Sequence, residues 1–354
     1  MQFGFKAGHS TSLSTMVLKE VIAYYTKHGG SLYCTMLDAT KAFDRVEYCK
    51  LFSGLLRRKL PAVYIRLLLN MYTNHLTRVS WNGICSSPFV VGNGVKQGGV
   101  ISPVLFCVYI DTLLVALKNS GFGCYIGGMF LGALAYADDI VLLAPTPKAM
   151  REMLQLCDSV AGDLRVIFNA AKSKCLAIGP KLKTPYAVPQ FQIGGKIVEF
   201  VDEWPHLGHI ISTTADDKMD IISKKRVVCQ QINNVLCFFR GRDPITKLAL
   251  MKAYCSSFYG AVLWDLTHPS IHEVCVVWRK GLRRAWDLPH STHCDLLPLL
   301  CDSLPLMDEL SCRSAKFIAN ALASENDVVR FVARHGVYFG RMSSPIGSNA
   351  HFVS

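Results

Sequence analysis

The sequence predicts an α+β fold followed by a mostly helical region, and three observations support this expectation. Between residues 32 and 178, short apolar runs alternate with longer segments of helical periodicity, which is typical of a domain built around a sheet. After residue 213 the periodicity is mostly helical. The 354 residues are 51% hydrophobic and 18% charged, which excludes a disordered chain.

The predicted sheet begins with an apolar run of strand length at residues 32–37. Helical patterns follow at 48–59 and 63–74, and Pro61 separates them because proline cannot continue a helix. The further expected elements are a hairpin, a helix opened by Ser102-Pro103, two strands, a helix, a strand, a second hairpin and a final apolar run, at 77–95, 102–117, 130–144, 150–164, 175–178, 190–200 and 206–212.

Charge and cysteine content narrow the function classes. Lys and Arg number 38 against 26 Asp and Glu, and the net charge of +12 favours a polyanionic partner such as nucleic acid. The first residues lack the apolar run of a secretory leader, so we expect reduced cysteines and a location inside the cell, in the nucleus or the cytoplasm. The longest uncharged run, 119–137, has the length of a membrane span but is interrupted by five glycines. It therefore predicts a hairpin, and we expect no membrane partner.

Carboxylates mark the candidate site. Asp138 and Asp139 lie in a turn between two apolar strands, and Asp38 ends the apolar run at 32–37. An Asp pair in a turn is usually only exposed to solvent. Three carboxylates that gather at strand ends, however, need a positive group beside them, because a buried unpaired charge is costly. Carboxylate oxygens favour Mg²⁺, so this pattern predicts a site for phosphoryl chemistry.

Four segments carry the most specific pattern. In chain order they are residues 37–44 (LDATKAFD), 94–103 (GVKQGGVISP), 136–139 (YADD) and 169–174 (NAAKSK). They resemble motifs A, B, C and D of the reverse transcriptase palm. Together with residues 2–5 (QFGF) and Leu207-Gly208, they are similar to the enzymes of non-LTR (LINE-type) retrotransposons. The resemblance covers most of residues 1–213 and extends more weakly beyond.

The resemblance implies a right-hand polymerase palm with an antiparallel sheet, partial fingers, a helical thumb and a C-terminal helical extension. The sequence begins at the QFGF segment, so most of the fingers are expected to be missing. The expected domains are a remnant of the fingers, a palm that includes the primer-grip hairpin, a thumb, and an extension with a loose tail, at residues 1–30, 31–212, 213–300 and 301–354.

Catalytic roles follow from the same resemblance. Asp38, Asp138 and the carbonyl of Ala39 would bind two Mg²⁺ ions, with Mn²⁺ as the alternative, and Asp139 would support them. Lys172 matches the motif D lysine that protonates or neutralises pyrophosphate, although a surface lysine is the default interpretation. No small-molecule cofactor is expected.

Substrate contacts are also implied. Phe43 falls at the sugar gate that would reject a 2′-hydroxyl, and a core phenylalanine is the alternative. Gln97 and Gly98 would lie near the incoming dNTP and the template, although the glycines could form only a turn. The residues that match the primer terminus contact and the primer-grip turn are Tyr136, Leu207 and Gly208.

Basic side chains on the predicted helices are candidates for phosphate contacts, and solvated helix faces are the alternative. These residues are Lys224, Lys225, Arg226, Arg279, Lys280, Arg283 and Arg284.

These residues favour RNA-directed DNA polymerisation with an RNA template, a DNA primer and dNTPs. One alternative is an inactive or repurposed fragment that binds nucleic acid. Another palm enzyme, such as a nucleotide cyclase, is disfavoured because its turn should be glycine-glycine-acidic.

Overall fold

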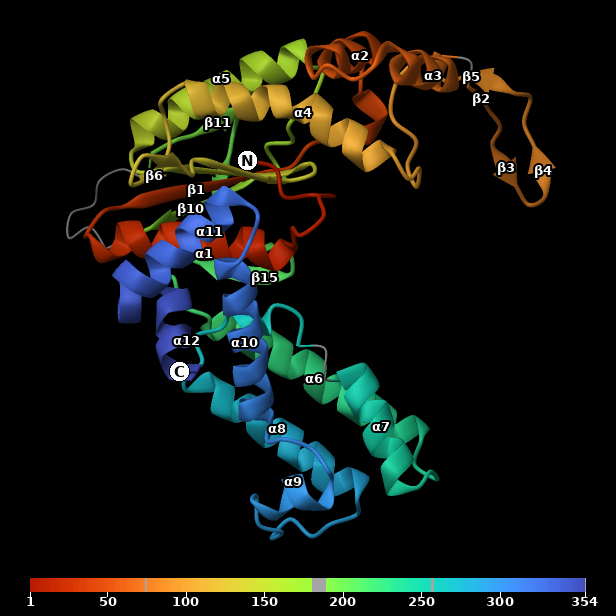
Figure 1. Cartoon of the computed structure of the whole chain (residues 1–354). Coiled ribbons are helices and arrows are strands. Elements are labelled where there is room, and N and C mark those ends of the chain that lie inside the picture. The colour runs from red at the N-terminus through yellow and green to blue at the C-terminus, as the bar shows by residue number, and fades with distance from the viewer. Residues whose placement is uncertain (74, 180–188, 256–257, 354) are drawn as a thin grey trace. The chain divides into compact units, whose positions relative to one another are not determined.

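The computed structural model describes residues 1–73, 75–179, 189–255 and 258–353 (Figure 1). Its contacts divide the chain into two units. The first unit comprises residues 1–14 and 29–201, and the second comprises 15–28 and 202–354. The predicted α+β class is confirmed, since the first unit is built on a sheet and the second is mostly helical.

A five-stranded sheet forms the centre of the first unit, in the order β13-β10-β1-β9-β8. The bounds are β1 Leu32–Leu37, β8 Ala133–Tyr136, β9 Asp139–Ala144, β10 Lys174–Ile178 and β13 Glu199–Phe200. The predicted apolar run is the central strand β1, and every residue in it is buried. Strand β1 is antiparallel to both β9 and β10, and only β13 runs parallel to its neighbour β10.

Two helices, α4 (Ser102–Asn119) and α5 (Pro147–Asp163), lie together over one face of this sheet (Figure 1). Pro103 stands in the first turn of α4, as expected. By length and hydropathy α4 could cross a membrane, yet half of it is buried inside the protein. Its buried side chains, among them Phe106 and Ile110, belong to the core of the first unit, which explains the hydropathy.

The predicted helices between the first two motifs are α2 (Tyr48–Arg57) and α3 (Ala62–Thr73), and the break between them falls at Leu60-Pro61 as expected. The predicted hairpin follows. It is a ladder of short pairs, β2 (Leu76–Thr77) with β5 (Phe89–Val90) and β3 (Ser80–Trp81) with β4 (Ile84–Cys85). The strand ends at Val90 and does not reach residue 95, because Val95 instead donates its N–H to the Phe43 carbonyl.

Two smaller hairpins complete the first unit. They are β6 (Tyr125–Ile126) with β7 (Met129–Phe130) and β11 (Gln192–Ile193) with β12 (Lys196–Ile197). The hairpins expected within 119–137 and at 190–200 are therefore confirmed, with their turns at the glycine pairs 127–128 and 194–195.

The second unit contains most of α1 (Thr11–Lys27), which the sequence patterns did not predict, and one hairpin. Its other elements are β14 (Glu203–His206), β15 (His209–Ser212), α6 (Lys218–Phe238), α7 (Pro244–Cys255), α8 (Ser270–Ala285), α9 (Leu296–Leu300), α10 (Leu306–Leu322), α11 (Asp327–Arg334) and α12 (Pro345–Val353). Trp264, Trp278 and Met251 are buried in its core. The hairpin β14–β15 lies in this unit, and the four domain limits stay a prediction.

Candidate functional site

The register of the sheet places Asp38 opposite Asp139. Leu37 pairs with Ile140, so the residues that extend β1 and begin β9 face each other at the next position. Asp138 precedes Asp139 in the turn between β8 and β9. The three predicted carboxylates therefore gather at one end of the sheet, because the antiparallel partner of β1 starts where β1 ends.

The turn that carries Asp138 is a two-residue hairpin, since Tyr136 pairs with Asp139. Its first central residue, Ala137, has φ of +59°, a left-handed value that costs energy for a residue with a Cβ. Gln2 stabilises this conformation. The Ala137 N–H donates to Gln2 Oε1 at 2.9 Å, and Gln2 Nε2 donates to the Ala137 carbonyl at 3.3 Å.

Gly4 explains why the QFGF segment lies so close to this turn. A Cβ on Gly4 would come within 2.5 Å of the Ala137 nitrogen, so only glycine fits. Backbone bonds pair the segment with β8, since Phe3 donates its N–H to the Ala135 carbonyl at 2.7 Å. Sequence reasoning included this segment in the resemblance but missed the role of Gln2 as the support of the carboxylate turn.

The three carboxylates lie in an unfavourable electrostatic environment. Burial, followed by the nearby Asp38, raises the pKa of Asp138, and burial followed by Asp138 and Asp38 raises the pKa of Asp139. Among the residues that the structure describes, none of the three forms an ion pair. Like charges without a counter-charge suit a bound divalent cation.

The protein donors for such a cation are few. Within the described part of the chain, no group of three or more His, Cys, Asp or Glu side chains could by itself hold a metal ion. A site here therefore needs backbone and substrate oxygens in addition to carboxylates, which is the usual composition of an Mg²⁺ site at phosphates.

The Ala39 carbonyl is available for that purpose. Ala39 forms an antiparallel bridge with Phe168, and the flanking residues make the bonds: Thr40 donates to Ile167, and Asn169 donates to the Asp38 carbonyl at 2.8 Å. In a bridge of this kind the N–H and C=O of the paired residue point away from the partner. The carbonyl of Ala39 is therefore directed to the opposite edge of its strand, the side on which β9 lies.

The loop that contains Lys172 is attached directly to Asp38. Besides the Asn169 bond, the Asp38 N–H donates to Ser173 Oγ at 3.1 Å. Lys172 is exposed and forms no ion pair among the described residues, whereas Lys174 donates to Glu199 Oε2 at 2.6 Å. The geometry therefore distinguishes the two lysines: Lys174 is occupied, and Lys172 has an ammonium to offer.

The glycine-rich loop before α4 is fixed to the segment after β1. Gln97 Nε2 donates to Asp44 Oδ1 at 3.2 Å, a contact that sequence reasoning missed. Gly94 has φ of +84°, and a Cβ there would lie 2.9 Å from the Asp44 carbonyl oxygen. Gly98 also has a left-handed φ, +79°, with open space where a side chain would be. The loop is thus held at Gly94 and Gln97 by contacts with Asp44, while Gly98 faces open space.

Phe43 and Tyr136 are both half-buried. The Phe43 ring stacks on the buried ring of Phe106, with centroids 4.8 Å apart and planes 16° apart. Phe43 is thus packed on the core and still partly exposed, which agrees with both interpretations of this residue. The Tyr136 ring contacts Phe5 at 6.3 Å between centroids.

The second unit contains the Leu207-Gly208 turn. His206 pairs with His209, so this is a second two-residue hairpin, with φ of +48° at Leu207 and +78° at Gly208. Positive φ at both central residues is the geometry whose twist matches paired strands.

The seven basic candidates fall into two groups. Four are engaged within the protein: Lys224 with the Gly208 carbonyl, Lys225 with Glu273, Arg283 with the Thr292 carbonyl and Arg284 with Asn233. The other three form no ion pair or side-chain hydrogen bond within the described ranges, and these are Arg226, Arg279 and Lys280.

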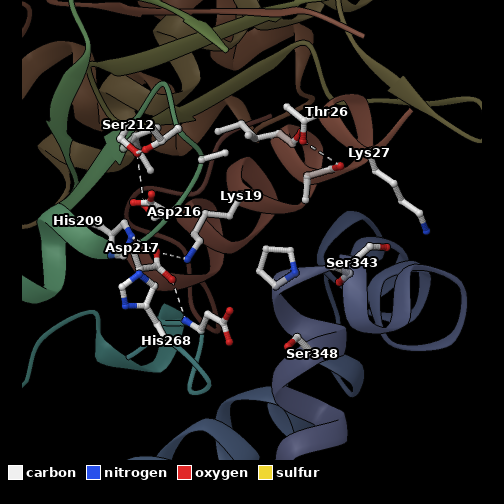
Figure 2. Close-up of a pocket in the computed structure, with 18 of the residues that line it drawn as sticks. Lys19, Thr26, Lys27, His209, Ser212, Asp216, Asp217, His268, Ser343 and Ser348 are labelled. Atoms are coloured by element: carbon white, nitrogen blue, oxygen red, sulfur yellow. Dashed lines mark hydrogen bonds and ion pairs between the residues drawn. The ribbon is translucent and has the colours of Figure 1, made fainter. Parts of the chain in front are cut away.

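A pocket of about 500 Å³ in the second unit contains none of the predicted site residues (Figure 2). It is lined by α1, β15, the loop that follows β15, Asp265 with His268, and residues 342–348, which reach into α12. Lys19 reaches from α1 to Asp217 on the pocket wall, with 2.5 Å between Nζ and Oδ1 (Figure 2). This pocket mixes both charge signs and hydroxyl groups, and Lys19 and His209 both lie close to the Asp217 carboxylate.

Comparisons with known proteins agree with the motifs. A family model described as reverse transcriptase (RNA-dependent DNA polymerase) matches residues 1–211. The chain is 30% identical over 215 residues to the retrovirus-related Pol polyprotein from type-2 retrotransposable element R2DM of Drosophila melanogaster, which is 58% of this chain and 20% of that protein. It is 32% identical over 216 residues to the Pol polyprotein from the type-1 retrotransposable element R2 of Nasonia vitripennis, with the same coverage of 58% and 20%.

The chain therefore spans about a fifth of the length of these two relatives. Among solved structures, a telomerase from Candida tropicalis in complex with a fragment of telomeric RNA aligns with a TM-score of 0.46 and 10% identity, over 93% of this chain and 54% of that chain.

Proposed function

Because this chain belongs to the reverse transcriptase (RNA-dependent DNA polymerase) family, we propose that it is the polymerising part of a non-LTR retrotransposon protein. In this proposal it extends a DNA primer with dNTPs on an RNA template. The observation that carries the proposal is the gathering of Asp38, Asp138 and Asp139 at one end of the sheet without a counter-charge.

Asp38, Asp138 and the Ala39 carbonyl are the groups that would bind two Mg²⁺ ions, or Mn²⁺ in their place. When bound, such ions lower the pKa of the primer 3′-hydroxyl and carry the charge that develops on the leaving pyrophosphate. Asp139 adds negative charge beside these ligands, and Gln2 keeps the turn in its strained conformation. The donor set is suited to this task because it consists of hard oxygens.

Other residues have separate tasks. Lys172 offers its ammonium to the pyrophosphate, because Lys174 is already held by Glu199. Gln97 and Gly98 lie beside the base pair that forms, with Gly98 permitting close backbone approach. Phe43 excludes a ribose 2′-hydroxyl by steric clash. Tyr136 and the Leu207-Gly208 turn contact the primer strand.

The nucleic-acid partners follow from the charge of +12. Arg226, Arg279 and Lys280 are the strongest candidates for phosphate contacts, since their charges are not used within the described protein. We expect the protein to act inside the cell, in the nucleus or the cytoplasm.

A primer-extension assay tests this function. Wild-type protein, an RNA template, a DNA primer and dNTPs should give extended DNA only when Mg²⁺ is present. Asp38→Asn should abolish extension, because it removes a charged metal ligand while it keeps the shape of the side chain. The matched control is Asp163→Asn, an exposed aspartate at the end of α5, which should extend like wild type.

Duplex affinity distinguishes catalysis from binding alone. Both variants should bind primer-template as wild type does, because binding depends on the basic side chains. If wild type binds the duplex but never extends it, polymerisation is contradicted and a nucleic-acid-binding role replaces it.

A further inference from the structure

The Leu207-Gly208 turn is held by side chains from distant parts of the second unit. Lys224, on α6, donates from Nζ to the Gly208 carbonyl oxygen at 2.8 Å. This bond uses the ammonium group that sequence reasoning had assigned to a nucleic-acid phosphate. A lysine that donates to a turn carbonyl fixes the orientation of that peptide, because the charged bond is stronger than a neutral one.

An aromatic ring covers the same turn from another segment. A Cβ built on Gly208 would lie 2.5 Å from the Tyr259 ring, so glycine alone allows this close contact. The Lys224 ammonium lies 5.9 Å from the centroid of that ring, within the range of a cation–π interaction. Lys224 and Tyr259 therefore support the turn together.

The backbone of the residue after Tyr259 also lies close to the Leu207-Gly208 turn. Gly260 has φ of +82°, and a Cβ there would lie 3.7 Å from both the Gly208 carbonyl oxygen and His209 Nδ1. Two consecutive residues of this loop thus face the turn at two points, one through its ring and one through its backbone.

The strand that leaves the turn is anchored as well. His209 is 2% exposed, and its ring nitrogens lie 3.3 Å from Asp217 Oδ1 and 3.2 Å from Asp220 Oδ2. Asp220 also accepts the Ile210 N–H at 3.1 Å and the Trp264 indole N–H at 2.7 Å. The turn therefore projects from a base that cannot shift without breaking buried polar contacts.

From these contacts we propose that Lys224 and Tyr259 are positioning residues that hold the Leu207-Gly208 turn in the geometry that orients the primer strand, and that Lys224 is not a phosphate contact. This inference rests on the proposed polymerase function. Neither residue touches the reacting atoms in this proposal. Their effect is on where the primer 3′ end lies once it is bound.

Salt dependence separates the two roles of a lysine. Loss of a phosphate contact lowers the slope of log affinity against log salt by about 1. We expect Lys224→Met to leave that slope for an RNA–DNA primer-template unchanged and to lower the extension rate at saturating primer-template by about tenfold or more, since small misplacements of a reacting group are costly. Arg226→Met, on the same helix, should lower the slope by about 1.

Matched variants complete the experiment. Lys218→Met removes an exposed lysine at the start of the same helix that forms no ion pair or side-chain hydrogen bond within the described ranges, and it should extend like wild type. Tyr259→Ala should lower the extension rate as Lys224→Met does, because it removes the ring that covers the turn. The double variant Lys224→Met/Tyr259→Ala should lose little more than the stronger single variant, because both side chains act through one turn.

The outcomes are distinguishable. If wild type extends the primer and Lys224→Met has a smaller salt slope with an unchanged rate at saturation, the positioning role is overturned and the polymerase function stands. A Tyr259→Ala protein that is folded by circular dichroism but extends the primer at the wild-type rate would also overturn it. Failure of wild type to extend any primer removes the proposed function, and the positioning inference with it.

Discussion

Two pairs of aspartates stand beside two-residue hairpins in this protein, and their surroundings differ. In the first unit Asp138 and Asp139 have no counter-charge among the described residues, and burial with like charges raises the pKa of both. In the second unit burial alone would raise the pKa of Asp217 and Asp220, yet neighbouring groups hold both below the ordinary value.

The difference lies in the partners. Lys19 and His209 act on Asp217, and His209 with the Trp264 indole acts on Asp220. Such paired carboxylates maintain structure, because their charge is satisfied inside the protein. Unpaired carboxylates at a strand end store unfavourable interactions that a bound cation would relieve, which is typical of a functional site. The same residue type is thus paired in the second unit and has no counter-charge among the described residues of the first.

The largest effect should come from the first pair. Asp138→Asn should lower primer extension by about a thousandfold or more, equivalent to about 4 kcal/mol of barrier, because it removes a proposed metal ligand. It should not destabilise the fold, since it removes a like charge beside Asp38 and Asp139. Extension rates and urea unfolding of the same samples measure both effects. A variant that unfolds more easily than wild type would contradict the contrast between the pairs.

The second pair should show the reverse. Asp217→Asn should destabilise the protein by about 3 to 5 kcal/mol, because it leaves Lys19 with a buried charge and no carboxylate. The exposed neighbour provides the control: Asp216→Asn should change the free energy of unfolding by less than about 0.5 kcal/mol. Equal unfolding midpoints for the two variants would show that the buried pair contributes no net stability.

Glu20 extends the comparison, because it is a buried carboxylate of the second unit whose hydrogen-bond partners are both neutral, while the charge of Lys19 acts on it only weakly. Its oxygens accept from Ser344 Oγ at 2.7 Å and from the Ile346 N–H at 2.7 Å, at the start of α12. Burial raises its pKa to about 7, and these hydrogen bonds offset only part of that. The folded state therefore keeps a proton that the unfolded chain loses at lower pH.

The sign of the pH effect follows. The contribution of Glu20 to stability is complete below the unfolded pKa of about 4.5 and is lost as pH rises through the folded value of about 7. Glu20→Gln should remove a decline of a few kcal/mol between pH 5 and 7.5, measured as the difference from wild type in urea unfolding. Glu325→Gln, at an exposed glutamate, should keep the decline. A decline that persists in Glu20→Gln would assign it to another group.

The smallest effect concerns Phe43, the proposed sugar gate, whose ring stacks on Phe106. Phe43→Val should raise ribonucleotide use relative to dNTP by about tenfold, because the smaller side chain admits a 2′-hydroxyl. It should also destabilise the fold by about 1 to 3 kcal/mol through the lost stacking on Phe106. The ratio of kcat/KM values for rNTP and dNTP measures the first effect. Phe106→Val should reduce stability without a change in this ratio; a change as large as that of Phe43→Val would assign the discrimination to packing.

Much of the first unit was predictable from the sequence. An uninterrupted apolar run gave the buried central strand β1, and Pro61 gave the break between α2 and α3, because both depend on neighbouring residues. The family resemblance is confirmed by the matching reverse transcriptase model and by relatives named as retrotransposable-element proteins. Helix α1 was not predicted, because residues 13–18 are buried on all sides of the helix and leave no amphipathic stripe to recognise.

By itself, the sequence determined most elements of the first unit and the positions of Asp38, Asp138 and Asp139 at strand ends, since strand periodicity and turn chemistry are local properties. Only the tertiary structure decided which polar groups are satisfied. Gln2 supports Ala137 across 135 positions of sequence, and Lys224 supports Gly208 across 16. A polar side chain takes the partner that folding brings within about 3 Å, and that choice depends on how distant segments meet. The local sequence pattern therefore identified the charged residues, and the fold decided which of them have a partner within the protein.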